Sequence, residues 1–289
     1  MRMLGIPVAD RDECALALDA AFELGKILDA GVAGYHMVAD KPAWEDRFDM
    51  AGVWAGGQLL PAPWPDDDEK ARRKMADKAR DLFQAKAEAA GFQCTSNIGS
   101  SKPGQAVYSE ISGTPDQAVP AFGPTNDMLV VSRPTPRGGM KAWVVMLSAL
   151  LDSTTPVLIM PQKKHTLKTD RIAIAWNNGA TEALLVRSAV PLLKQAKEVT
   201  FITANGESRH GPRAKDMINY LKAHGVKASQ KKVKGKSAAS AIETAVDELD
   251  AGLLLSGGYT RGRMRELVMG GVTENLVTKT RLPVLMLHK

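Results

Sequence analysis

Two glycine clusters near the C-terminus are the residues of this 289-residue chain best suited to binding an anion. Gly257 follows the apolar run Leu253 to Leu255, and the pair Gly270-Gly271 precedes a helical pattern that begins at Val272. Glycine lets the backbone approach a ligand closely, and the first N–H groups of a helix attract phosphate. The two clusters can therefore face one phosphate-bearing ligand.

The elements around these glycines alternate between strand and helix. In the second half we expect strands at 171–176, 199–204, 226–233, 253–255 and 282–288, and helices at 180–196, 212–224 and 237–249. Regular alternation of apolar strands and amphipathic helices is the signature of a parallel sheet that is covered on both faces.

The first half repeats this pattern. Its expected strands are 3–9, 32–39, 128–132 and 156–161, and its expected helices are 13–28 and 69–90. Two internal echoes support a duplication: LVVSRP (129–134) with LLLSGG (253–258), and TPVLIMP with LPVLMLH. The sequence therefore predicts two domains, 1–162 and 171–289, joined by a polar linker at 163–170.

An insertion at 41–68 distinguishes the first domain. It carries Trp44, Trp54 and Trp64 among Pro, Gly and Asp residues, a composition typical of a loop. Three tryptophans can form a partner surface, because aromatic anchors dominate interfaces. We favour the alternative that they cover the domain's own apolar surface, since large loops need a packed cluster of their own.

The composition limits the class of protein. Hydrophobic residues make up 44% of the chain and charged residues 24%, which is typical of a globular protein with a substantial core. The net charge of +6 is spread along the chain and does not indicate nucleic-acid binding. Only Cys14 and Cys94 are present, and no apolar run reaches the length of a membrane span, so we expect a cytoplasmic protein without a disulfide framework.

The glycine spacing resembles the nucleotide motif of the universal stress protein family. In that family the fourth strand is followed by Gly, two residues, Gly, nine residues, and Gly with Ser or Thr. Gly257 takes the first place and Gly270 the last. The chain departs from the motif at Thr260, whose Cβ obstructs close approach to phosphate, and at Gly271, which lacks the hydroxyl group.

The resemblance implies a fold and a site. The fold would be two tandem doubly wound α/β domains, Rossmann-like and adenine-nucleotide-hydrolase-like, with parallel five-stranded sheets. The crevice of the second domain would lie beyond strands one and four. The implied nucleotide-binding residues are Asn177, Asn178, Thr203, Gly257, Thr260, Arg261, Gly270 and Gly271. Asn177 stands where the family commonly has Asp, so any help from Mg²⁺ would be weakened.

The first domain lacks this motif. Ser132 is followed by RPTPRGGMKAWVVM, in which Val145 and Met146 take the places of the last two motif residues. The resemblance implies that this degenerate domain is a structural partner. The two domains would then pack as the family's homodimers do, with their last strands meeting. Whether two copies of the whole chain also form a homodimer is left open by the sequence.

The function implied by the resemblance is stress-response regulation through an adenine nucleotide, ATP being the candidate cofactor, or a related small ligand. One alternative is a protein-interaction scaffold that binds no nucleotide. Another is a slow ATP hydrolase, which would need a metal-holding carboxylate that the sequence does not reveal near Asn177. The five histidines are dispersed, so the sequence indicates neither a metal site nor a catalytic residue.

Overall fold

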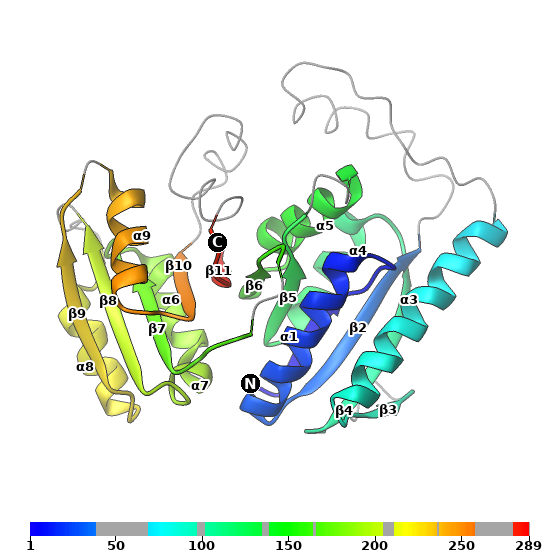
Figure 1. Ribbon diagram of the computed structural model, residues 1–289, viewed down its shortest axis with the longest axis horizontal. Coiled ribbons are helices and arrows are strands. Elements are labelled where there is room, and N and C mark those ends of the chain that lie inside the picture. The colour runs from blue at the N-terminus through cyan, green and yellow to red at the C-terminus, as the bar shows by residue number, and fades with distance from the viewer. Residues whose placement is uncertain are drawn as a thin grey trace, which may run out of the picture.

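The computed structural model describes residues 1–38, 69–96, 102–134, 139–163, 166–204, 211–235, 237–257 and 280–288. Their strands form one eleven-stranded sheet in the order β3-β4-β2-β1-β5-β6-β11-β10-β7-β8-β9 (Figure 1). The first six strands belong to the first half of the chain and the other five to the second half. The expected tryptophan-bearing insertion at 41–68 lies outside the described residues.

The first half has a mainly parallel arrangement of strands and helices. Its elements are β1 (Met3–Pro7), α1 (Asp12–Leu28), β2 (Gly31–Val38), α3 (Glu69–Ala89), β3 (Gln93–Thr95), β4 (Gln105–Ser112), α4 (Pro115–Phe122), the 3-10 helix η3 (Gly123–Thr125), β5 (Met128–Ser132), α5 (Gly139–Asp152) and β6 (Val157–Met160). This part of the sheet is six-stranded, where the resemblance implies five strands. The sequence pattern places four of the six, and β3 and β4 lie outside the expected strands.

The second half has the predicted five strands. Its elements are β7 (Arg171–Ala175), α6 (Ala180–Ser188), α7 (Val190–Leu193), β8 (Glu198–Ala204), α8 (Ala214–Ala223), β9 (Ala228–Val233), α9 (Ala238–Glu248), β10 (Leu253–Gly257) and β11 (Val284–Leu287). Ser237 caps α9, since its side chain accepts a hydrogen bond from the Ser240 N–H.

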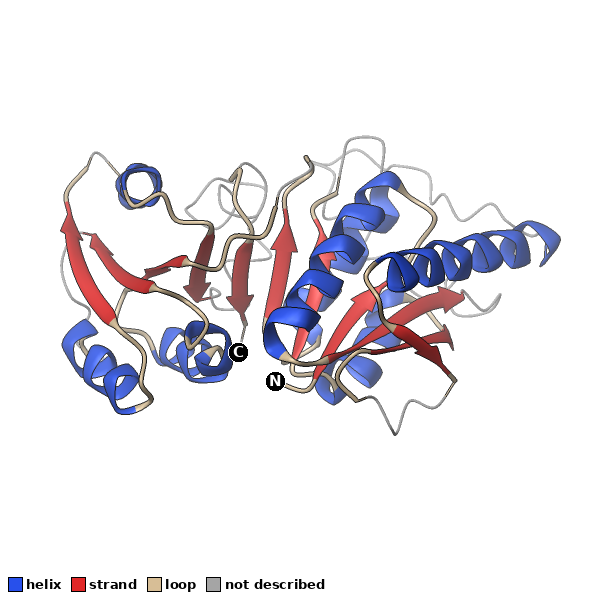
Figure 2. Ribbon diagram, turned by 60° about the horizontal axis from the view of Figure 1, so that its bottom comes forward, coloured by secondary structure: helices blue, strands red, loops and turns tan. Residues whose placement is uncertain are grey.

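Helices cover both faces of the sheet, as the sequence predicts. On one face, residues of α1, α3, α6, α7 and α8 share a single apolar core that spans both halves. On the other face, α4 and α5 pack over the first half, whereas α9 packs over the second. Figure 2 shows the two layers of helices from the side. The chain is therefore a doubly wound α/β structure.

The two halves are joined through their last strands. β6 and β11 pair antiparallel, with Ile159 opposite Val284 and Val157 opposite Met286. All other pairs in the sheet are parallel. The expected meeting of the last strands is thus observed, and it makes one continuous sheet out of two (Figure 1).

The sheet corrects the alignment of the repeat by one residue. Leu4 pairs with Met128 in the first half, and Ile172 pairs with Leu253 in the second. Met128 is therefore the counterpart of Leu253, although the sequence echo aligns Leu253 with Leu129. Strands buried on both faces are nearly continuous apolar runs, so they carry no alternation that would fix their alignment. Ser132 consequently becomes the counterpart of Gly257.

Candidate functional site

The candidate site lies at the carboxyl ends of β7 and β10. These strands are parallel neighbours, with Ala175 opposite Ser256, so the residues that follow them meet at one edge of the sheet. The chain runs from β7 through β8 to β9 in one direction and then crosses over to β10 and β11. Strand order therefore reverses between β7 and β10, which is where open parallel sheets bind ligands.

Asn177 organises the loop between β7 and α6. Its side-chain Oδ1 accepts a hydrogen bond of 2.8 Å from the N–H of Gly179, the residue that caps α6. The next residue, Asn178, is buried and has a left-handed backbone with φ of 63°. Its carbonyl oxygen lies so close to Gly211 that a Cβ there would overlap it. The loop is thus held by a local turn and by tight backbone packing.

Glu182 places a carboxylate in this crevice. It is the third residue of α6, only 7% exposed, and the Asn177 side chain hydrogen-bonds to it. A Cβ at Gly257 would overlap Glu182 Cδ, and a Cβ at Gly179 would overlap Glu182 Oε2. The two glycines therefore provide the space that the carboxylate occupies between the ends of β7 and β10.

Burial is the main influence on the Glu182 carboxyl group. It raises the pKa, because the charged form loses its hydration, while hydrogen bonds from the residue's own backbone N–H and from Asn177 act in the opposite direction. The Asn177 Oδ1 is engaged by Gly179, so the amide Nδ2 is the atom that donates to the carboxylate. Asn177 thus links the loop to the acid.

Glu182 is a carboxylate near Asn177 that the sequence analysis does not identify. The available signal was an acid in the first turn of the helix that follows strand one, where a carboxylate also complements the helix dipole. One carboxylate does not make a metal site. Among the residues that the structure describes, no group of three or more His, Cys, Asp or Glu side chains could hold a metal ion.

Thr203 occupies the end of β8, beside the crevice. Its hydroxyl oxygen accepts a hydrogen bond of 3.1 Å from Gln230 Nε2 on the neighbouring strand β9. The side chain therefore bridges two strands, and the expected role of Thr203 in nucleotide binding stays a prediction. The remaining predicted residues, Thr260, Arg261, Gly270 and Gly271, lie outside the described part of the chain, so their proposed roles also stay predictions.

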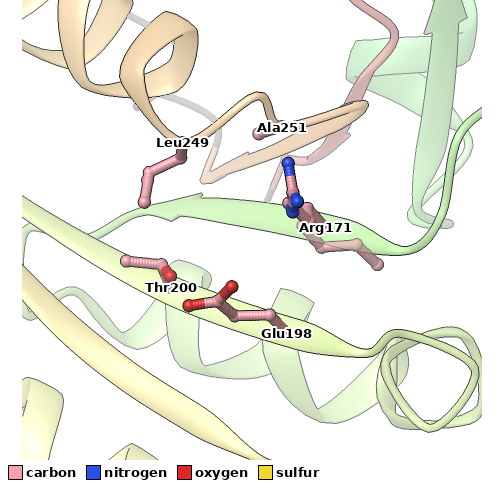
Figure 3. A pocket seen from close by; sticks show the side chains of 6 residues that line it. Arg171, Glu198, Thr200, Leu249 and Ala251 are labelled. Carbon is pink, nitrogen blue, oxygen red and sulfur yellow. The ribbon is translucent and has the colours of Figure 1, made fainter.

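A shallow hollow lies at the opposite end of the same strands (Figure 3). Its lining residues are Arg171, Ile172, Glu198, Thr200, Leu249 and Ala251. Arg171 and Glu198 begin β7 and β8, and the Arg171 guanidinium pairs with Asp250 at 2.8 Å. Because the hollow is at the amino ends of the strands, it is separate from the crevice at their carboxyl ends.

The first half has an equivalent loop of equal length. Three residues separate the end of β1 at Pro7 from the capping residue Arg11, as three separate Ala175 from Gly179. The third residue of α1 is Cys14, the counterpart of Glu182. Its Sγ accepts from the Ala9 N–H at 3.4 Å and donates to the Pro7 carbonyl at 3.6 Å.

Several polar side chains near the loop between β1 and α1 make hydrogen bonds or ion pairs with other residues of the chain. His36 Nδ1 lies 2.9 Å from the Val8 carbonyl, and Lys78 pairs with Asp10 at 3.0 Å. Arg133, just beyond β5, is 3% exposed and donates to the carbonyl of Thr280 in the second half. Burial lowers the Arg133 pKa to about 10. The end of β5 is thus tied to the segment that leads into β11.

Together, the fold and the crevice define a doubly wound α/β domain with a candidate ligand site at its switch point. Residues 171–288 match the sequence model of the Universal stress protein family. The second half of the chain therefore carries a domain of this family, as the glycine spacing suggests. No curated protein matches the sequence. Within the described residues, no helix has the length and apolar character of a membrane span.

Solved structures extend the likeness to the whole chain. A universal stress protein from Archaeoglobus fulgidus DSM 4304 is similar over 100% of this chain and 96% of its own, with a TM-score of 0.67 and 16% identity. A universal stress protein from Pseudomonas aeruginosa UCBPP-PA14 is similar over 99% of this chain and 93% of its own, with a TM-score of 0.52 and 13% identity. A functionally unknown protein from Pseudomonas aeruginosa PAO1 is similar over 99% of this chain and 92% of its own, with a TM-score of 0.52 and 12% identity. These likenesses show that both halves share this fold.

Proposed function

We propose that the second domain binds an adenine nucleotide or a related small ligand, and that the chain acts in this way as a stress-response regulator. The observation that carries the proposal is the cluster of Asn177, Glu182 and Gly257 at the switch point of a universal stress protein domain. Polar groups that converge on a glycine-lined end of a parallel sheet suit a nucleoside-sized ligand.

The first domain serves as an intramolecular partner in this proposal. Its loop between β1 and α1 closes on itself through Cys14, and its last strand pairs with β11. One chain then supplies the arrangement that two copies would otherwise form. Cys14 and Cys94 are both free thiols, which suits a reducing compartment such as the cytoplasm.

Calorimetric titration with ATP, ADP and AMP, with and without Mg²⁺, tests this function. We expect saturable binding at roughly micromolar concentration. The variant Gly270→Val, chosen from the sequence motif, should weaken binding at least about tenfold. Glu198→Gln, at the opposite end of the same strands, should bind as the wild type does.

Absence of any heat or thermal shift with all three nucleotides would overturn the proposal. The protein would then be treated as an interaction scaffold, and its partner sought by affinity capture. Wild-type affinity in Gly270→Val would leave ligand binding in place but would remove the second glycine cluster from the site.

A further inference from the structure

The Glu182 carboxylate is costly for the folded protein. It is 7% exposed, and among the described residues its pKa is raised by burial and lowered by hydrogen bonds from its own backbone and from Asn177. Burying an ionisable carboxyl group away from water opposes folding unless its partners compensate. A group of this kind at the switch point of an α/β sheet is a candidate for ligand recognition.

The fold itself does not require an acid at this position. Cys14 stands at the same place in α1, after a loop of the same length, and closes that loop through backbone groups alone. The neighbouring strand carries Ser132 where the second half has Gly257. Gly257 thus makes room for the longer Glu182 side chain, so the acid and the glycine form a matched pair specific to the second domain.

The position of the carboxylate determines which chemical groups it can receive. An ionised carboxylate accepts hydrogen bonds at roughly four lone-pair sites, of which the described residues engage two, through the Asn177 amide and the Glu182 N–H. The remaining capacity suits the hydroxyl groups of a ligand. A phosphate at the same place would be repelled by the negative charge of the carboxylate, and burial from water would strengthen this repulsion. The N-terminus of α6 would not attract the phosphate strongly, because Glu182 already complements the helix dipole there.

We propose that Glu182 determines the specificity of this crevice, by accepting the ribose hydroxyl groups of a nucleoside and by disfavouring phosphate beside the start of α6. This inference rests on the proposed function and narrows its ligand to one that presents a neutral vicinal diol to the carboxylate. Asn177 acts as a positioning residue, since it holds the carboxylate through its amide while its Oδ1 fixes the loop.

The test is calorimetric titration of the full chain with adenosine, 2′,3′-dideoxyadenosine, AMP and ATP. A site built to bond a hydroxyl group rejects an analogue that lacks it, so adenosine should bind at least about tenfold more tightly than the dideoxy analogue. In Glu182→Gln the diol preference should fall to about threefold or less, and ATP should gain affinity. The matched control Glu198→Gln should behave as the wild type.

Two outcomes separate this inference from the proposed function. Equal wild-type affinity for adenosine and its dideoxy analogue, or an undiminished preference in Glu182→Gln, would overturn the role of Glu182 while ligand binding stands. Failure of every ligand to bind would overturn both. The wild-type ligand series decides the diol preference even if the variant does not fold, and circular dichroism establishes whether it does.

Discussion

The two crevices of this chain occupy the same place in the same fold but use their polar groups differently. In the first half, the third residue of the helix after strand one is Cys14, whose thiol bonds to the backbone of its own loop. In the second half that residue is Glu182, a buried acid held by the Asn177 side chain. The thiol at this position thus bonds within its own loop, although the neighbouring Glu13 is equally buried and its Oε1 has no hydrogen-bond partner among the described residues. The carboxylate at the same position in the second half is held by a side chain of the preceding loop instead.

The difference fits the proposal that the two halves of a duplicated fold have separate structural and binding roles. Burial raises the Cys14 pKa to about 11, so its thiol is protonated near neutral pH and unsuited to reaction with a ligand. Arg133, one residue beyond β5, is directed to the Thr280 carbonyl of the other half. The Cys14 thiol and the Arg133 guanidinium therefore bond within the molecule, which fits the proposal that the second domain binds the ligand.

The largest expected effect on stability comes from replacing Gly257 by serine, the residue that stands at the equivalent position, Ser132, in the first half. In Gly257→Ser the new Cβ would overlap Glu182 Cδ, and such overpacking costs about 1–3 kcal/mol of unfolding free energy. Urea denaturation of the variant and the wild type measures this loss. The double variant Gly257→Ser with Glu182→Cys reproduces the Ser132 and Cys14 pair and should recover most of the stability.

The double variant also serves as the control for backbone strain at Gly257. If the single variant is as stable as the wild type, the carboxylate does not occupy the space above Gly257, and the contrast between the crevices is wrong. If the double variant recovers nothing, the cost comes from the backbone at Gly257 and not from Glu182.

Much of the fold is predictable from the sequence because strands buried on both faces are short apolar runs between turn residues. The predicted strand 128–132 coincides with β5, and the predicted helix 13–28 differs from α1 by one residue. β3 and β4 were missed. β3 has three residues, of which two are exposed, and half of β4 is polar, so neither forms an apolar run.

The site is predictable only in part. Asn177 and Gly257 follow from the rule that ligands bind beyond the carboxyl ends of neighbouring strands. Glu182 does not follow, because an acid in the first turn of a helix is ordinarily a solvated partner of the helix dipole. Its burial depends on glycines at two positions, Gly179 and Gly257, that are 78 residues apart and meet only in the folded sheet.

A second, smaller effect tests why Asn stands at 177 where the family commonly has Asp. In Asn177→Asp the donated hydrogen bond is lost and a second carboxylate faces Glu182, so we expect a loss of about 1–2 kcal/mol near neutral pH. Protonation of one acid should relieve the repulsion, and the deficit should shrink as pH falls. Urea denaturation at several pH values measures this.

Moving the acid provides the matched control for Asn177→Asp. The double variant with Glu182→Gln again has one carboxylate and one amide, so it should regain most of the lost stability. A deficit that neither acid pH nor the double variant reduces would show that the two side chains are not coupled.

The smallest expected effect is a change in the pH dependence of stability in Glu182→Gln. Burial raises the Glu182 pKa in the folded state, so over the range between the ordinary and the raised value the folded protein binds more protons than the unfolded chain. Stability of the wild type therefore falls as pH rises through this range and then levels off. Glutamine does not titrate, so the variant lacks this decline, and its stability relative to the wild type should increase with pH. Melting temperatures of both proteins from about pH 4 to about pH 8 measure the difference, and parallel curves would mean that the carboxyl group titrates as it does in water.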